Sequence, residues 1–156
     1  MAHRVAHSSP AAPRPVVRVG NDLCSTTVVA SAVASFGDRY LRRLYTDHEL
    51  DYCLASAAAA PSRLAARFAA KEATLKVLRP IEARPDWRSI EVVRHDDGHC
   101  ELALHRRAAE LAADAQLDQW SVSLSHEGDL AAAIVVAIGI GVGEVNTETS
   151  RRSSDA

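Results

Sequence analysis

The sequence predicts one α+β domain in which an antiparallel sheet packs against helices. Segments with the two-residue apolar period of strands, or with a short apolar run, fall at residues 16–19, 90–94, 100–104, 120–126 and 130–138. An alanine-rich segment that ends before Pro80 has the apolar spacing of a helix. Turn residues at 96–98 and 128–129 join neighbouring strands as hairpins, which build antiparallel sheets. A chain of 156 residues is long enough for one such domain.

The expected boundaries of the domain follow from composition. Residues 1–15 are rich in Ala, Pro, Ser and His and show no period, so we expect a disordered leader there. Residues 140–156 are polar and low in aromatic residues, which predicts a flexible tail. The folded domain is therefore expected at residues 16–139.

The N-terminal part of the domain is expected to run from a strand into helices. A Gly-Asn-Asp-Leu sequence at 20–23 is typical of a turn, and a turn there would place Asp22 just beyond a strand end. A helix of small residues follows. Thr46 and Glu49 then have the spacing of a capping box, which predicts the start of another helix at this point.

The helix over residues 63–76 is where the sequence predicts chemistry. At 100° per residue its apolar residues form a core stripe: Leu64, Phe68, Leu75 and Leu78. Lys71 falls inside this stripe, so its ammonium must meet water, a carboxylate or an anionic ligand, because an unpaired buried charge is very costly. Glu72 precedes Lys76 by one turn, and the two form either a solvated ion pair or part of a ligand-facing edge.

The C-terminal half is expected to contain two hairpins separated by a helix. The helix is predicted at residues 106–117 and the next strand at 120–126. The last strand, 130–138, is apolar throughout and is expected to be buried on both faces. Three residues beside the first hairpin turn could be read as zinc ligands, although solvated turn residues are the favoured interpretation: His95, His99 and Cys100.

Composition excludes several classes of protein. A net charge of −2 and a pI of about 6.4 give no support for nucleic-acid binding, so any anion site must be local. Three cysteines without CxxC spacing favour reduced thiols and a cytoplasmic location. The long apolar run at 130–142 is too short to span a bilayer, so no membrane partner is expected. The sequence contains neither a P-loop nor a GxGxxG motif, which excludes nucleotide binding through those devices.

Two carboxylates and several cations are the residue types of a phosphate-transfer site. Asp22 and Glu72 suit a hard cation such as Mg²⁺, which keeps some of its waters and binds substrate phosphates. His126 is a candidate phosphate contact, whereas Ser125 and His126 are disfavoured as a nucleophile and its base because adjacent strand residues point to opposite faces. Nearby cations would neutralise the remaining phosphate charge: Arg63, Arg67, Lys71 and Lys76.

Four blocks of this sequence resemble the motif series of the holo-acyl-carrier-protein synthases. They are VGND at 19–22, FGDRYLRRLYTDHEL at 36–50, RFAAKEA at 67–73 followed by Lys76, and VSLSH at 122–126. The resemblance implies a small α+β phosphopantetheinyl transferase that works as a homotrimer with sites between subunits. Such enzymes transfer 4′-phosphopantetheine from coenzyme A to a serine of an apo acyl carrier protein and release adenosine 3′,5′-bisphosphate.

The resemblance also implies roles for the candidate residues. Asp22 and Glu72 would hold Mg²⁺ on the diphosphate of coenzyme A, the expected co-substrate. Lys76 would stabilise the developing charge and shuttle a proton. Either carboxylate, directly or through water, would receive the proton of the carrier serine. The expected coenzyme A contacts are four cationic or polar side chains: Arg63, Arg67, Lys71 and His126.

Departures from the family pattern keep alternatives open. Val28 stands where many members have an arginine that meets an acidic helix of the carrier, although Arg39 and Arg43 remain at matching positions. Residues 98–100 lack the proline of the family hairpin. Two other hypotheses therefore stand beside transfer. One is a protein that binds coenzyme A or a carrier without transferring the arm, and the other is an enzyme acting on a carrier-bound or coenzyme A-bound acyl group in specialised metabolism.

Overall fold

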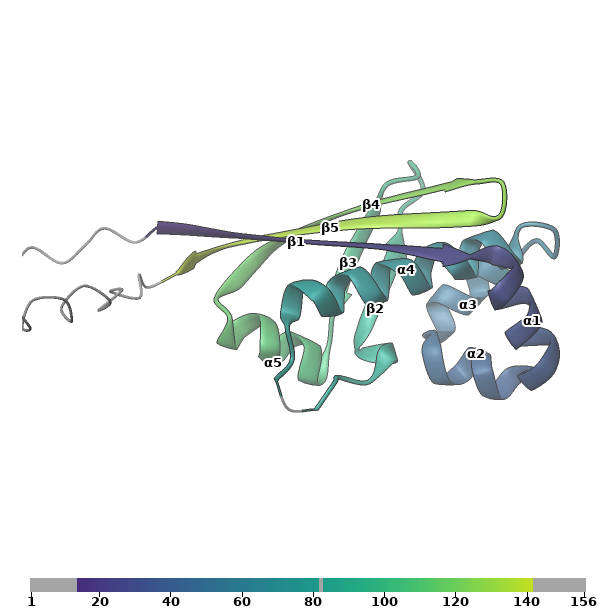
Figure 1. Cartoon of the computed structure of the whole chain (residues 1–156), viewed down its shortest axis with the longest axis horizontal. Coiled ribbons are helices and arrows are strands. Elements are labelled where there is room, and N and C mark those ends of the chain that lie inside the picture. Colours follow the sequence, from purple (N-terminus) through teal and green to yellow (C-terminus); the bar gives the residue numbers. More distant parts are fainter. Residues whose placement is uncertain (1–13, 82, 142–156) are drawn as a thin grey trace, which may run out of the picture.

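A computed structural model describes residues 14–141 with the exception of residue 82 (Figure 1). The predicted leader and tail lie outside this range except for their innermost residues, which belong to strands. None of the described helices is both long and apolar enough to cross a membrane. The elements follow in the order β1 (Arg14–Ser25), α1 (Thr26–Phe36), α2 (Asp38–Leu44), α3 (Asp47–Leu54), α4 (Ala60–Leu78), the 3-10 helix η1 (Trp87–Ser89), β2 (Ile90–Arg94), β3 (Cys100–Leu104), α5 (Arg106–Asp114), β4 (Leu117–Glu127) and β5 (Leu130–Gly141).

The α+β prediction is confirmed, with two antiparallel sheets rather than one among the described residues. The larger sheet has the strand order β1-β5-β4, and the smaller consists of the β2-β3 hairpin. The last strand of the chain lies in the centre of the larger sheet and pairs with the first strand, for example Val136 with Val19. All helices of the described range lie on one side of this sheet (Figure 1).

Helix α4 lies directly against the larger sheet because small residues line the contact. Ala65, Ala69 and Ala73 are fully buried, and a Cβ atom built on Gly20 of β1 would lie 2.1 Å from the carbonyl oxygen of Ala73. Only a glycine allows this approach. The position of the helix under β1 and β5 therefore depends on small side chains in both elements.

The predicted turn at residues 20–23 is wrong, because β1 continues without interruption to Ser25. Every residue of this segment pairs with β5, and Asp22 lies opposite Ala133. The long partner strand overrides the turn preference of Gly, Asn and Asp. Gly20 serves the close packing of α4 instead of a turn, and Asp22 lies within the strand rather than beyond its end.

The last strand is buried on one face only, which corrects the prediction of burial on both. Ala133 and Val135 face the helices and are buried, whereas Ile134 is 52% exposed on the opposite side. This outer face of the larger sheet is apolar, and its side chains have exposed fractions of 38% to 64%: Val17, Val19, Leu23, Ile134, Ile138 and Ile140. Exposed apolar surfaces of this kind are typical of the contact surfaces of proteins.

We expect Gly20→Ala to destabilise the protein by about 1–3 kcal/mol, because the added methyl group overlaps the Ala73 carbonyl and forces β1 away from α4. Asn21→Ala, one residue further on the exposed side of the strand, is the matched control. The check is urea denaturation followed by circular dichroism. Equal unfolding midpoints for the two variants would show that the close contact is not needed.

Candidate functional site

The predicted site residues of α4 lie on two opposite edges of the helix. At 100° per residue, Arg63 and Arg67 are on one edge, and Glu72 and Lys76 are about 140–180° away on the other. The sheet-facing alanines and the core stripe separate the two edges. The helix therefore presents an arginine edge and a carboxylate edge, which do not face the same space within one chain.

On the carboxylate edge, Lys76 joins α4 to β1. Its Nζ donates to the Asp22 carboxylate at 2.9 Å and to the backbone carbonyl of Asn21 at 2.6 Å. Strand alternation turns Asp22 to the same side of the sheet as Gly20, towards the helix. Within the described part of the chain, the Glu72 carboxylate has neither a hydrogen bond nor an ion pair.

The charges of both carboxylates act on the same neighbouring thiol. Burial raises the pKa of Cys24, and the negative charges of Asp22 and Glu72 raise this pKa further. Two carboxylates with free oxygen atoms beside one ammonium form a donor set that suits a hard divalent cation such as Mg²⁺. The residues present thus fit the predicted metal, and the raised pKa keeps Cys24 a neutral thiol rather than a nucleophile.

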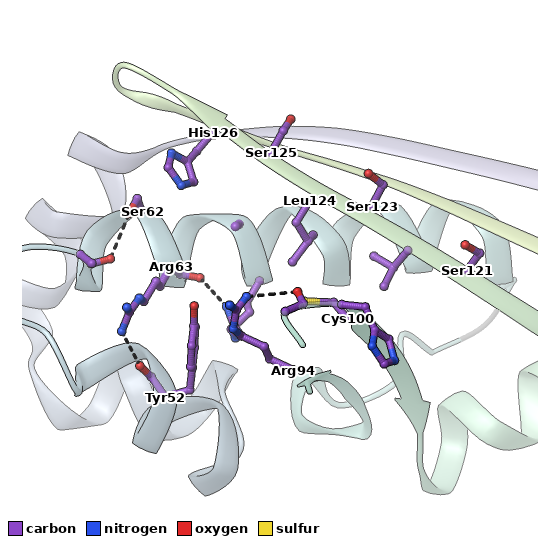
Figure 2. Close-up of a pocket in the computed structure, with 16 residues that line it drawn as sticks. Tyr52, Ser62, Arg63, Arg94, Cys100, Ser121, Ser123, Leu124, Ser125 and His126 are labelled. Carbon is purple, nitrogen blue, oxygen red and sulfur yellow. Dashed lines mark hydrogen bonds between the residues drawn. The ribbon is translucent and has the colours of Figure 1, made fainter. Parts of the chain in front are cut away.

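On the arginine edge, three guanidinium groups surround one aromatic ring. The Cζ atoms of Arg63, Arg67 and Arg94 lie 4.4, 4.3 and 5.2 Å from the ring centroid of Tyr52. These residues line a pocket of about 810 Å³ between α4, the β2-β3 hairpin and β4 (Figure 2). Cation–π contacts hold the guanidinium groups close together although they repel one another.

The pocket has the electrostatics of an anion site. Arg67 is only 3% exposed, and its Nε is buried without a hydrogen-bond partner. One of its other nitrogens donates to the carbonyl of Arg63 at 3.3 Å. None of the described residues that line the pocket carries a carboxylate. An anion with several oxygen atoms, such as a phosphate, would satisfy the free donors and relieve the repulsion.

His126 is the candidate phosphate contact that belongs to β4. It lies near the end of β4, lines the same pocket and is exposed. Figure 2 shows its ring above Ser62 at one end of the pocket, while the serines of β4 follow along the strand. The structure therefore brings His126 together with Arg63 and Arg67.

Lys71 lies outside both edges, in a buried ion pair. Its Nζ is 2.8 Å from a carboxylate oxygen of Glu49, and both side chains are fully buried. It also donates to the backbone carbonyls of Trp87, at 3.1 Å, and of Ile90. Of the three environments predicted for this ammonium, the structure shows the carboxylate. A fully buried and fully paired ammonium cannot reach coenzyme A phosphates, so the candidate site does not include Lys71.

The sequence interpretation missed Tyr52 and Arg94, which complete the arginine pocket. Tyr52 belongs to α3 and Arg94 ends β2, so only the fold brings them to Arg63 and Arg67. An exposed arginine beside a glycine turn was the only local signal for Arg94, whose Nη1 donates to the carbonyl of Gly98 at 3.2 Å.

Comparison with known proteins shows the class of transferase to which the chain belongs. Residues 18–135 match the family model of the 4′-phosphopantetheinyl transferase superfamily. The chain is 38% identical to the holo-[acyl-carrier-protein] synthase of Gloeobacter violaceus over 78% of its own length and 92% of that protein. It is 41% identical to the enzyme of that name from Geobacter sulfurreducens, covering 75% and 93% of the two chains.

Solved structures agree with these relatives. The ACPS–coenzyme A complex of Chronobacterium ammoniagenes superposes with a TM-score of 0.68 at 26% identity, over 78% of this chain and 96% of that one. On these similarities, the chain belongs to the holo-[acyl-carrier-protein] synthase family of the phosphopantetheinyl transferases. The resemblance predicted from the four sequence blocks is thereby confirmed.

Proposed function

We propose that this protein transfers 4′-phosphopantetheine from coenzyme A to a serine of an apo acyl carrier protein in a Mg²⁺-dependent reaction. The products are the holo carrier and adenosine 3′,5′-bisphosphate. The observation that carries the proposal is the pairing on one helix, α4, of a carboxylate edge suited to a metal ion with an arginine edge suited to phosphates. Phosphoryl transfer depends mainly on positioning and charge neutralisation, which these groups supply.

Asp22 and Glu72 would hold Mg²⁺, which when bound neutralises charge on the diphosphate. The ammonium of Lys76 already lies at the Asp22 carboxylate and would stabilise the negative charge that develops on the leaving phosphate. The same lysine can deliver a proton to that oxygen. Asp22 or Glu72 would accept the proton of the carrier serine, directly or through water.

The arginine edge would hold the other phosphates of coenzyme A. Arg63, Arg67 and Arg94 offer planar donor forks around Tyr52, and His126 adds a ring nitrogen at the end of the pocket. Binding energy from these remote contacts positions the diphosphate for attack. Val28 is 65% exposed on α1 and is available for contact with the carrier.

We further propose that the protein acts as a homotrimer with sites between subunits. Two observations support this. The arginine and carboxylate edges of α4 face opposite directions within one chain, so one ligand reaches both most directly if the two edges come from neighbouring copies. The outer face of the larger sheet exposes apolar side chains of β1 and β5 that a second copy would cover.

The test is intact-protein mass spectrometry of a panel of apo carrier proteins incubated with this protein, coenzyme A and Mg²⁺. We expect a mass gain of one phosphopantetheine arm on at least one carrier, and a loss of about 100-fold or more in rate for Glu72→Ala. Glu110→Ala, on the exposed side of α5, is the matched control and should keep the rate.

Two outcomes would contradict the proposal. Binding of coenzyme A and Mg²⁺ without a mass gain on any carrier would favour a repurposed member of the fold, which binds coenzyme A or a carrier or acts on an attached acyl group. A full rate in the Glu72→Ala variant would contradict the assignment of the carboxylate edge.

A further inference from the structure

The β2-β3 hairpin carries a second cluster of potential metal ligands that phosphopantetheine transfer does not require. His95 follows β2, and His99 and Glu101 lie on the opposite side of the turn. The backbone nitrogen of His95 donates to the carbonyl of His99 at 3.0 Å, which makes the two histidines neighbours across the hairpin. Glu101 follows two residues later and therefore lies on the same face of the strand as His99.

The side chains converge closely. The imidazole rings of His95 and His99 stack with their centroids 4.1 Å apart and their planes 7° from parallel. The Nε2 atoms of His95 and His99 lie 3.1 and 3.4 Å from the two oxygens of the Glu101 carboxylate. The three ligand atoms lie within 4.8 Å of one another, and this is the one such group of His, Cys, Asp or Glu found among the described residues.

These separations fit tetrahedral coordination. With metal–nitrogen and metal–oxygen distances of about 2.0–2.2 Å, neighbouring ligand atoms on a tetrahedron are about 3.3–3.6 Å apart. The observed nitrogen–oxygen separations of 3.1 and 3.4 Å run to the two oxygens of Glu101 and are of this size. Because the two rings are stacked nearly parallel, they must rotate apart for both Nε2 lone pairs to meet one ion. The Nε2 atom of His95 is buried and makes no well-aligned hydrogen bond despite its closeness to Glu101, so it is available to a metal ion.

Asp97 orients one of the ligands from behind. Its carboxylate lies 2.5 Å from Nδ1 of His99 and accepts from the backbone nitrogen of the same residue at 3.1 Å. A proton held on Nδ1 by this contact leaves the lone pair of Nε2 pointing at Glu101. A carboxylate behind a histidine is the usual support of a metal-binding imidazole.

We propose that His95, His99 and Glu101 form a site for a divalent transition-metal ion of the Zn²⁺ type. Two imidazoles and one carboxylate are the ligand set that such ions prefer over Mg²⁺. Three protein ligands leave a fourth position for water or another small donor. The site is separate from the Asp22 and Glu72 pair, although His99 also lines the arginine pocket. The third ligand is Glu101 rather than Cys100, the thiol considered from the sequence.

The test is isothermal titration of the full chain with Zn²⁺ in the presence of excess Mg²⁺, which occupies the carboxylate edge. We expect the wild type to bind one Zn²⁺ ion at this site. The single variants His95→Gln, His99→Gln and Glu101→Gln should each lose the binding of that ion. The Asp97→Asn variant should still bind the ion, but its affinity for Zn²⁺ should fall by about 10-fold or more, because only the supporting carboxylate is lost.

His105→Gln is the matched control. Its ring also lies 2.9 Å from a glutamate, Glu91, but it belongs to no group of three converging ligands in the described chain. The His105→Gln variant should bind as many Zn²⁺ ions per chain as the wild type does. Histidine ring nitrogen NMR provides the second measurement, and Zn²⁺ should shift the Nε2 signals of His95 and His99. Unchanged Zn²⁺ binding in the His95 and His99 variants, or unshifted Nε2 signals, would overturn the proposal.

Discussion

Glu49→Ala is expected to lower the free energy of unfolding by about 3–5 kcal/mol, because it leaves the Lys71 ammonium buried without a counter-charge. The lost carboxylate is fully buried and accepts two further hydrogen bonds. One oxygen accepts from the backbone nitrogen of Thr46 at 2.9 Å and closes the capping box of α3, and the other accepts from Val92 at 3.1 Å. Glu49 therefore ties α3 to α4 and to β2 at once.

The double variant Glu49→Gln with Lys71→Met separates charge from packing. It removes both buried charges, keeps an amide oxygen for Val92 and fills the space of the lysine stem. We expect it to be more stable than Glu49→Ala, since replacing a whole buried ion pair costs less than breaking one. The measurement is urea denaturation at one fixed protein concentration, because association would also contribute to stability.

The pH dependence of Glu49→Ala has a defined sign. Burial lowers the pKa of Lys71 below its ordinary value of 10.5, and Glu49 opposes this shift in the wild type. Without Glu49, the folded variant releases the proton that the unfolded chain still binds. The free energy of unfolding of the variant should therefore rise with pH up to about 10.5. The difference in unfolding free energy between the variant and the wild type should narrow over the same range. Two results would contradict the role of Glu49 as the counter-charge of Lys71. One is a difference in unfolding free energy that does not change with pH, and the other is a destabilisation no larger than that of Glu110→Ala.

The sequence predicted the elements whose signals are local. The capping box, the β2-β3 turn and the central helix each depend on residues a few positions apart, and all three are present in the structure. The turn predicted at 20–23 is wrong because the strand that pairs with this segment, β5, is remote in sequence. The packing of Gly20 is equally invisible to local signals. Gly20 packs against Ala73, and neither residue alone carries a sign of that contact.

In the candidate site, too, local sequence signals identified single residues but not their remote partners. Lys71 was recognisable as a cation in a core stripe, but its partner lies 22 residues earlier and already had an explanation as a capping residue. A carboxylate with four oxygen lone-pair positions can serve as a cap and as a counter-ion together, and periodicity does not reveal this double use. Tyr52 and Arg94 join the pocket only through the packing of α3 and the β2-β3 hairpin on α4.

Mixing two inactive variants is expected to restore activity if sites form between subunits. Glu72→Ala removes the carboxylate edge and Arg67→Ala removes the centre of the arginine edge. Each alone should lower the rate of transfer by about 100-fold or more, because each removes charge stabilisation that the reaction needs. Arg63→Ala is a second pocket variant, for use if the loss of buried Arg67 prevents folding.

The size of the recovery follows from the geometry of α4. The two edges face opposite directions, so in a closed trimer each site would take Glu72 from one copy and Arg67 from its neighbour. When the two variants are co-expressed in equal amounts with different tags, about one interface in four combines two unaltered edges. Purification through both tags removes the trimers of a single variant, and in each remaining trimer about one interface in three is intact. The purified mixed oligomers should therefore regain about a third of the wild-type rate.

A site contained within one chain gives a different result. Every chain in the mixture then carries one defect in its own site, and the rate stays at the level of the single variants however the subunits are combined. Mixed oligomers that contain both tagged variants but show no recovery would contradict the shared site while leaving transfer itself intact. Recovery of about a third would assign the arginine and carboxylate edges to neighbouring copies, and it would support the exposed apolar face of β1 and β5 as a surface between them.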